Sequence, residues 1–326
     1  MPTSSNTAMA NTPTQSTQRG NGKLLITGEY LVLDGALALA LPVSLGQSLE
    51  FTYSMEASDT LLWKSLDNQG KEWVNKSFNK SGESSFETAD DQSFHALLDH
   101  TVFQDKKLAA VTCRLAFDRQ WGLGSSSTLI YCLANHYQCN PYELSAKSFG
   151  GSGYDIACAG HQSPILYQRN LEAVYSPTVQ QATWAPNFTN QIYFIYLGKK
   201  QNSRDAIAHY KQLNQSEKPI HAMNELTKSI NDSADFMETA YLIQKHERLM
   251  ASVLKTPCLD EKLWKDSALV SKSLGAWGGD FCMVLFQGPI GDLSKIASRH
   301  GLDTVLPWSY FSFESPKPSV SSTFSS

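Results

Sequence analysis

The chain has 326 residues, 41% of them hydrophobic, so it is long enough to bury the core of one large domain or two medium ones. Its formal net charge of −4 lacks the excess of Lys and Arg that holds nucleic-acid phosphates or anionic membrane surfaces. No stretch approaches the roughly 20 apolar residues of a membrane span. We therefore expect a small-molecule partner, no nucleic acid and no membrane.

The cysteines and the two ends of the chain indicate its setting. The six cysteines include no CxxC pair and no Cys/His spacing that suits zinc, which fits a reduced, cytoplasmic protein. Residues 1–20 lack the apolar run of a secretory signal. Residues 1–20 and 314–326 are rich in small polar residues and are predicted to be disordered tails, because they offer little apolar surface to offset ordering entropy.

In the first half, apolar or alternating runs predict an antiparallel sheet. Strands are expected at residues 23–33, 37–43, 47–53 and 109–117. Residues 61–66 and 72–78 flank an Asp-Asn-Gln-Gly turn and read as a hairpin. Helical spacing recurs over residues 94–103 and 126–137.

The second half changes character at residues 191–197, a strand candidate that precedes a long helical region over residues 205–254. A strand over 281–286, a helix over 293–300 and a strand over 304–311 follow. Mixed strands and helices in this order predict an α+β fold. We place a domain boundary near residue 188, which separates domains of residues 21–188 and 189–313.

The segment from Gly122 to Thr128 (GLGSSST) lies between an extended run and an amphipathic helix. Free amides at a helix start can hold an anion, and glycines let the backbone approach a phosphate closely. The alternative is that these residues simply cap the helix. No Walker A pattern occurs, and the protein-kinase set of motifs is missing, so two common ATP-binding designs are unsupported.

Four segments together resemble the GHMP kinase superfamily. They are GKLLITGEYLVLDG at residues 22–35, GLGSSS at 122–127, FGGSGYDIA at 149–157 and GAWGGD at 275–280. The third segment is similar to a stretch of the mevalonate and phosphomevalonate kinases, and it most resembles the subgroup called GYDIA-family GHMP kinases. Trp277 and Asp280 depart from the glycines usual in the fourth motif.

The resemblance implies an N-terminal domain like domain 2 of ribosomal protein S5 and a ferredoxin-like C-terminal domain. ATP with Mg²⁺ would bind between them, and a homodimer is an open expectation. The residues implied to bind ATP are Gly122, Leu123, Gly124, Ser125, Ser126 and Ser127.

Two residues are candidates for catalysis. Asp155 follows a Gly-Ser-Gly turn and could accept a hydroxyl proton, although it could instead cap a helix. Lys23 begins an apolar strand and could neutralise developing charge, although lysines at strand starts are commonly surface residues. The resemblance implies that this lysine lies beside the base.

The remaining candidates concern the acceptor and the metal. Contacts with the acceptor substrate are expected from Glu29, Tyr30, Ser152, Gly153 and Asp280, although Glu29 could instead be a structural cap. The resemblance implies that Ser126 holds Mg²⁺, with Glu143 as a candidate acidic ligand. Further candidates to contact an anionic substrate are His161, Arg169, Lys199 and Arg204.

The sequence therefore predicts an ATP-dependent kinase that phosphorylates a hydroxyl or phosphate group on a mevalonate- or phosphomevalonate-like acceptor. The alternative is a non-catalytic nucleotide-binding protein that retains the same fold. Trp277 and Asp280 motivate the alternative, whereas the presence of both Lys23 and Asp155 argues against it.

Overall fold

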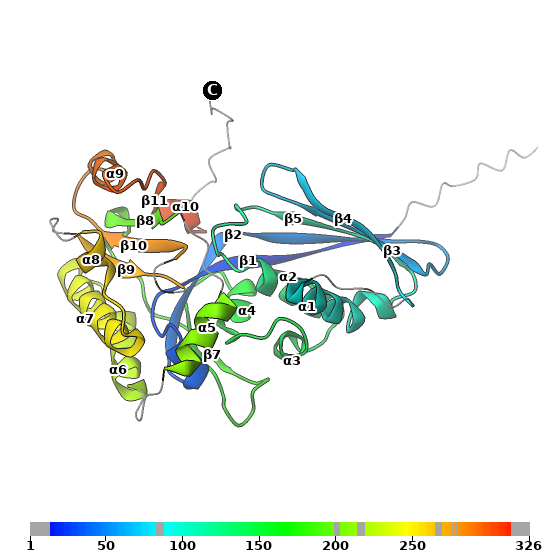
Figure 1. Ribbon diagram of the computed structural model, residues 1–326, viewed down its shortest axis with the longest axis horizontal. Helices are drawn as coiled ribbons and strands as arrows, with labels where there is room; N and C mark the ends of the chain where they lie inside the picture. The colour runs from blue at the N-terminus through cyan, green and yellow to red at the C-terminus, as the bar shows by residue number, and fades with distance from the viewer. Residues whose placement is uncertain are drawn as a thin grey trace, which may run out of the picture.

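A computed structural model describes residues 14–81, 88–198, 203–213, 219–264, 269–275, 277 and 279–313, with the side chains of 203 and 204 left aside. Two sheets with their helices lie side by side along the long axis of the molecule (Figure 1). Among the helices of these residues, none is long and apolar enough to cross a membrane. The prediction of an α+β fold is confirmed.

The larger sheet has seven strands in the order β4-β3-β5-β2-β6-β7, with β1 paired to β2. The strands are β1 Gln15–Leu25, β2 Ala38–Tyr53, β3 Thr60–Leu66, β4 Glu72–Asn79, β5 Leu108–Leu115, β6 Ile165–Gln168 and β7 Thr178–Gln181. The β3–β4 hairpin is confirmed, and β3 pairs with β5 in parallel. The two runs expected at 37–43 and 47–53 form the single strand β2.

Helices α1 Ala89–Asp99, α2 Ser125–His136, α3 Pro141–Ala146 and α4 Tyr154–Ala159 lie along one face of this sheet (Figure 1). Their apolar sides share a buried cluster with the strands, in which Leu129 and Leu133 of α2 lie with Leu49 and Phe51 of β2. The helical spacing seen in the sequence thus reflects one face buried against the sheet.

The smaller sheet has the order β11-β8-β10-β9, and its strands are β8 Ile192–Tyr196, β9 Val270–Ser273, β10 Phe281–Leu285 and β11 Val305–Pro307. Its helices are α5 Ser203–Gln212, α6 Ile220–Asp232, α7 Phe236–Leu254, α8 Leu259–Lys262, α9 Ile290–Ser298 and α10 Trp308–Phe311. Side chains of β8 and β10 alternate between two buried clusters, so both faces of the sheet are covered.

Three sequence predictions are corrected at element ends. The tail predicted over residues 1–20 is wrong for residues 15–20, because β1 begins at Gln15 and pairs with Thr52 of β2, which supplies backbone hydrogen bonds that composition does not reveal. The tails predicted over residues 1–13 and 314–326 lie outside the described residues. The strand expected over 23–33 stops at Leu25, since Gly28 adopts φ 88° and leads into the 3₁₀ helix η1 Leu31–Asp34. The strand expected over 304–311 becomes helical after Pro307.

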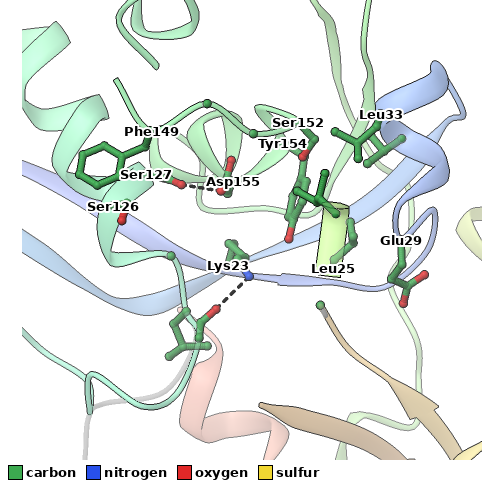
Figure 2. A pocket seen from close by; sticks show the side chains of 18 of the residues that line it. Lys23, Leu25, Glu29, Leu33, Ser126, Ser127, Phe149, Ser152, Tyr154 and Asp155 are labelled. Atoms are coloured by element: carbon green, nitrogen blue, oxygen red, sulfur yellow. Dashed lines mark hydrogen bonds between the residues drawn. The ribbon is translucent and has the colours of Figure 1, made fainter. Parts of the chain in front are cut away.

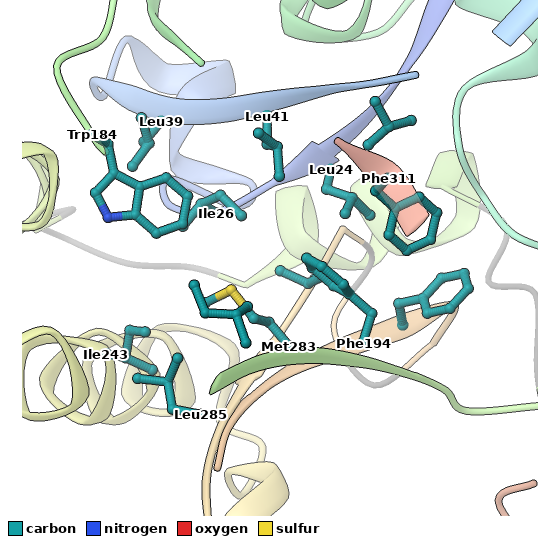
Figure 3. Packing of buried hydrophobic residues seen from close by; sticks show 14 of the residues in the cluster. Leu24, Ile26, Leu39, Leu41, Trp184, Phe194, Ile243, Met283, Leu285 and Phe311 are labelled. Carbon is teal, nitrogen blue, oxygen red and sulfur yellow. The ribbon is translucent and has the colours of Figure 1, made fainter. Parts of the chain in front are cut away.

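One apolar cluster joins the two sheets. Leu24, Ile26 and Leu41 of the larger sheet face Phe194 and Met283 of the smaller one (Figure 3). The boundary near residue 188 falls between β7 and β8 and remains a prediction, since the core continues across it.

Because the two sheets share this core, Phe194→Ala should destabilise the whole molecule. Phe194 is 0% exposed, and emptying such a site costs ~3–5 kcal/mol. We expect one unfolding transition in urea, shifted to lower denaturant, by circular dichroism and Trp fluorescence alike. Leu62→Ala, at a position 44% exposed, is the control and should cost less than about 1 kcal/mol. Two separate transitions in the Phe194 variant would contradict the shared core.

Candidate active site

A cavity of about 610 Å³ brings together residues from the loop after β5, the starts of α2 and α4, β1, and the turn before β10 (Figure 2). Twelve of the fourteen predicted site residues line it: Lys23, Glu29, Tyr30, Gly122, Leu123, Gly124, Ser125, Ser126, Ser127, Ser152, Asp155 and Asp280. Gly153 and Glu143 do not. Segments up to about 250 residues apart in the sequence therefore form one pocket.

The predicted phosphate loop begins α2 in a conformation that favours glycine. Gly122 has φ 62° and Gly124 φ 90°, a region that side chains with a Cβ rarely enter. Gly124 is the N-cap residue, and no side chain hydrogen-bonds there as a cap. The serines that follow therefore do not act as the N-cap of α2, which favours the anion-binding interpretation over the capping one.

Lys23, which is half-buried, connects this loop to β1 by two hydrogen bonds. Its Nζ donates to the carbonyl of Gly122 at 2.9 Å, and its backbone N–H donates to the carbonyl of Leu123 at 3.1 Å. Burial by itself lowers the pKa of Lys23, but acidic groups of the pocket outweigh it, so the pKa is raised. In order of effect these groups are Tyr154, Asp280 and Asp155. Lys23 therefore presents a permanent positive charge.

Both carboxylate oxygens of Asp155 are held. Ser127 Oγ donates to Asp155 Oδ2 at 2.5 Å, and the backbone N–H of Ile156 donates to Oδ1 at 3.0 Å (Figure 2). The contact with Ile156 lies within the first turn of α4, whose N-cap residue is Gly153 and which no side chain caps, so the capping alternative is wrong. The Asp155 side chain lines the pocket. The sequence predicted a phosphate contact for Ser127, whereas its hydroxyl orients Asp155.

Gly153 is the one acceptor candidate that does not line the pocket. It has φ 92°, and a Cβ there would lie 2.7 Å from the Tyr167 hydroxyl. That hydroxyl donates to the carbonyl of Ser152 at 2.7 Å. The expectation of a substrate contact from Gly153 is therefore corrected: close packing and a left-handed backbone require glycine, while Ser152 lines the cavity.

Glu29 and Tyr30 are adjacent but play different parts. Glu29 is 1% exposed, and its carboxylate pairs with Lys272 and lies 3.1 Å from His246 Nε2. It also lines the cavity, so its contact with the acceptor stays a prediction. The alternative of a structural cap is not supported, because no side chain caps η1, the helix that follows the turn. Tyr30 has φ 57° and lines the cavity, and its hydroxyl accepts from the backbone N–H of Trp277 at 3.2 Å. Burial raises the pKa of Tyr30 to about 12.

Glu143, the predicted acidic ligand of the metal, lies away from Ser126 and the cavity, and the structure gives its predicted role no support. Glu143 is on α3, lies outside the cavity lining, and pairs with Lys147 at 2.7 Å, one turn along the same helix. Ser126 does line the cavity. Among the described residues, no three His, Cys, Asp or Glu side chains form a group that could hold a metal ion.

The cavity lining carries further charged residues besides Lys23 and Asp155. Asp280 is 8% exposed, and its carboxylate lies so close to Gly122 that a Cβ on this glycine would be 2.0 Å from Oδ2. Arg119 and Lys211 line the cavity together with the predicted Arg169. The sequence analysis missed the first two, since no pattern marks them.

His161 lies outside the lining. Lys199 and the side chain of Arg204 lie outside the described residues.

The chain has the α+β fold of the GHMP kinases, as its motifs predicted. It is similar, with a TM-score of 0.64, to the Lin0012 protein from Listeria innocua (16% identity, 91% of this chain and 97% of that chain covered). Streptococcus pneumoniae phosphomevalonate kinase, solved with phosphomevalonate and AMPPNP, also has a TM-score of 0.64 (17% identity, 90% and 99% covered). L. major mevalonate kinase, solved with R-mevalonate, has a TM-score of 0.61 (14% identity, 91% and 96% covered). No family model and no curated protein matches the sequence.

Gly122→Ala should weaken nucleotide binding, since the new Cβ would collide with the Asp280 carboxylate and resist φ 62°. We expect the Kd of MgAMPPNP in calorimetry to rise roughly tenfold or more, a change that needs only about 1.4 kcal/mol. Gly70→Ala is the matched control, because Gly70 also has positive φ but a Cβ there meets nothing within 4 Å. Unchanged affinity in the Gly122 variant would count against the loop.

Proposed function

We propose that this chain is an ATP-dependent kinase that transfers the γ-phosphate to a hydroxyl or phosphate group on a small anionic acceptor, similar to mevalonate or phosphomevalonate. The observation that carries the proposal is the meeting of three groups in one cavity. They are the glycine loop at the start of α2, the Lys23 ammonium and the Asp155 carboxylate held by Ser127. A phosphate site, a fixed cation and an oriented base are the parts that phosphoryl transfer requires.

Each group has a separate task. The loop amides and the positive end of α2 would hold the phosphate chain, and Lys23 would offset the charge that develops on the transferred group. Asp155 would accept the proton of the acceptor hydroxyl as its oxygen bonds to phosphorus and the bond from phosphorus to the ADP oxygen breaks. Where the acceptor is itself an ionised phosphate, no proton needs to be removed, and Asp155 would only position it.

The oxygen donors of the cavity would suit a magnesium ion that is coordinated mainly by the phosphates of the nucleotide. Mg²⁺ commonly binds through one or two protein oxygens, several waters and substrate phosphates, rather than in an all-protein cage. Ser126 supplies a hydroxyl to the cavity, and the Asp155 and Asp280 carboxylates lie in the same lining. When bound, the ion would neutralise phosphate charge.

Cations away from the phosphate loop support an anionic acceptor. Arg169 and Lys211 come from the segment after β6 and from α5, and they line the cavity together with Tyr30 and Leu33. The Arg169 guanidinium also reaches the carbonyl of Leu33 at 3.5 Å. Solved relatives of this fold were crystallised with phosphomevalonate or R-mevalonate, both anionic, but another was crystallised with galactose.

The alternative function is a nucleotide-binding protein without turnover. It is favoured by Asp280, whose carboxylate beside Gly122 makes the approach of a polyphosphate electrostatically less favourable. A screen of ATP consumption with mevalonate, phosphomevalonate and galactose separates the two. We expect turnover with an anionic acceptor and none with galactose, whereas MgAMPPNP binding without turnover on any acceptor would favour the alternative. A cytoplasmic location and a homodimer stay predictions from the sequence.

Asp155→Asn should abolish most of the turnover on a hydroxyl acceptor while preserving nucleotide affinity, because the amide keeps the shape but cannot accept the proton. Loss of a general base lowers rates by roughly 10²–10⁴-fold. Steady-state kinetics and MgAMPPNP calorimetry measure the two effects. Asp292→Asn, in an exposed ion pair on α9, is the control. Wild-type kcat in the Asp155 variant would exclude it as the base.

Ser127→Ala should lower kcat less than Asp155→Asn does. The substitution leaves Asp155 ionised but removes the 2.5 Å hydrogen bond that orients it, and hydrogen bonds to charged groups are worth about 1.5–3 kcal/mol. We therefore expect a fall in kcat of roughly tenfold or more. Ser294→Ala, which removes an exposed hydroxyl from α9, should change nothing. If Ser127 instead binds phosphate, its loss would raise the Kd of MgAMPPNP and leave kcat intact.

A further inference from the structure

Four charged or titratable side chains lie buried together, and of these Glu29 alone lines the cavity. Glu29, His246, Glu247 and Lys272 are each at most 2% exposed, and we refer to them as the ionic cluster. Lys272 Nζ contacts Glu29 Oε1 and lies 3.1 Å from Glu247 Oε1. His246 Nε2 lies 3.1 Å from Glu29 Oε2. The proposed mechanism gives none of these four a task.

The cluster ties three separate elements together. Glu29 belongs to the turn after β1, His246 and Glu247 lie on α7, and Lys272 lies on β9. Burial alone would raise the pKa of Glu29, but Lys272 and His246 outweigh it, so that pKa is lowered. Burial alone would lower the pKa of Lys272, but Glu29 and Glu247 outweigh it, so that pKa is raised. Glu29 and Lys272 are therefore held as an ion pair in the interior.

A second set of contacts connects the Glu29–Lys272 ion pair to the wall of the cavity. The Lys272 ammonium lies 5.9 Å from the centre of the Trp277 ring. The backbone N–H of Trp277 donates to the Tyr30 hydroxyl at 3.2 Å, and Tyr30 directly follows Glu29 in the chain. The contacts thus close a ring from Glu29 through Lys272 and Trp277 to Tyr30.

Trp277 has a place in this ring that its sequence position does not suggest. In the fourth motif it departs from the glycine that is usual in the GHMP kinases. The structure places Trp277 outside the cavity lining and packs it against a buried cluster that includes Leu31 and Tyr210. Its ring shields the Lys272 ammonium while its backbone meets Tyr30.

We propose that Lys272 is a positioning residue that sets the acceptor-side wall of the cavity. By pairing with Glu29 and Glu247 beneath Trp277, it holds the Tyr30 turn against the turn that precedes β10. A buried ion pair adds little net stability compared with apolar side chains of equal volume. Hydrogen-bonded charges are directional, however, whereas apolar packing is not. The ionic cluster is therefore better suited to fix the positions of the Tyr30 turn and the turn before β10 than to stabilise the fold.

Lys272→Met alone leaves two buried carboxylates without their cation and is expected to fold poorly. The informative variant is Glu29→Gln combined with Lys272→Met, which removes one charge of each sign and keeps the volumes similar. It leaves one buried carboxylate, that of Glu247, which keeps the hydrogen bond from Ser273 Oγ at 3.0 Å and His246 Nδ1 at 3.8 Å. Its control is Asp292→Asn combined with Lys295→Met, the same kind of change at an exposed ion pair on α9. Glu247→Gln keeps the Glu29–Lys272 pair and is a milder variant, so the test does not depend on one folded protein.

The first test needs no turnover. Hydrogen exchange should become at least tenfold faster in peptides that contain residues 28–35 and 269–281 of the Glu29/Lys272 double variant. Peptides that contain residues 122–128 should exchange as in the wild type, and the exposed control pair should change nothing. Glu247→Gln should shift the same two segments by less. Wild-type exchange at both segments in the folded variants would overturn the proposal, and so would an equal increase everywhere, which would show a purely structural role.

The second test rests on the proposed function. With an acceptor that the wild type phosphorylates, the double variant should raise the acceptor KM at least tenfold and leave the Kd of MgAMPPNP within twofold. An unchanged acceptor KM, or an equal loss of nucleotide affinity, would contradict positioning of the acceptor wall. If the wild type phosphorylates no acceptor, the proposed function fails, while the exchange experiment still decides whether Lys272 holds the two turns together.

Discussion

Apolar side chains of β1 and β2 pack against those of β8 and β10 in one core, and the meeting of the two sheets around the cavity depends on this contact. Leu24 and Ile26 lie in that core, one residue to either side of Leu25, which lines the cavity. Because side chains alternate along a strand, the same backbone serves the core on one face and the cavity on the other. Burial in the shared core thus fixes where Lys23 and the glycine loop meet the second sheet.

Charge is divided between two places that differ in their access to solvent and ligand. In the cavity, Lys23, Asp155 and Asp280 act on one another across space that a ligand can enter. In the ionic cluster, Lys272 pairs with Glu29 and Glu247 in the interior. The two groups are joined through Tyr30, so this interior pair lies directly behind a wall of the cavity. Such a supporting layer is what a precise binding site requires.

Residues of all four short motifs line one cavity, but the contacts of each residue depended on its partners. Ser127 belongs to a loop that suits phosphate, yet its hydroxyl donates to Asp155. Glu29 belongs to a motif expected to face the acceptor, yet its carboxylate is buried. In both cases the motif specifies a backbone path, and the direction of the side chain follows from residues brought near by folding.

The resemblance to the GHMP kinases supplied Lys23 and Asp155 as candidates, whereas the sequence by itself determined the α+β class, the β3–β4 hairpin and the loop at the start of α2. These features depend on local periodicity, turn residues and glycines with positive φ, all of which are encoded within short segments of the sequence. Only the tertiary structure decided that residues 15–20 join a strand, that Glu143 pairs with Lys147 outside the cavity, and that Lys272 meets Glu29. Lys272 and Glu29 are 243 residues apart, and no local pattern encodes such a contact because it arises only when the two sheets close on one core.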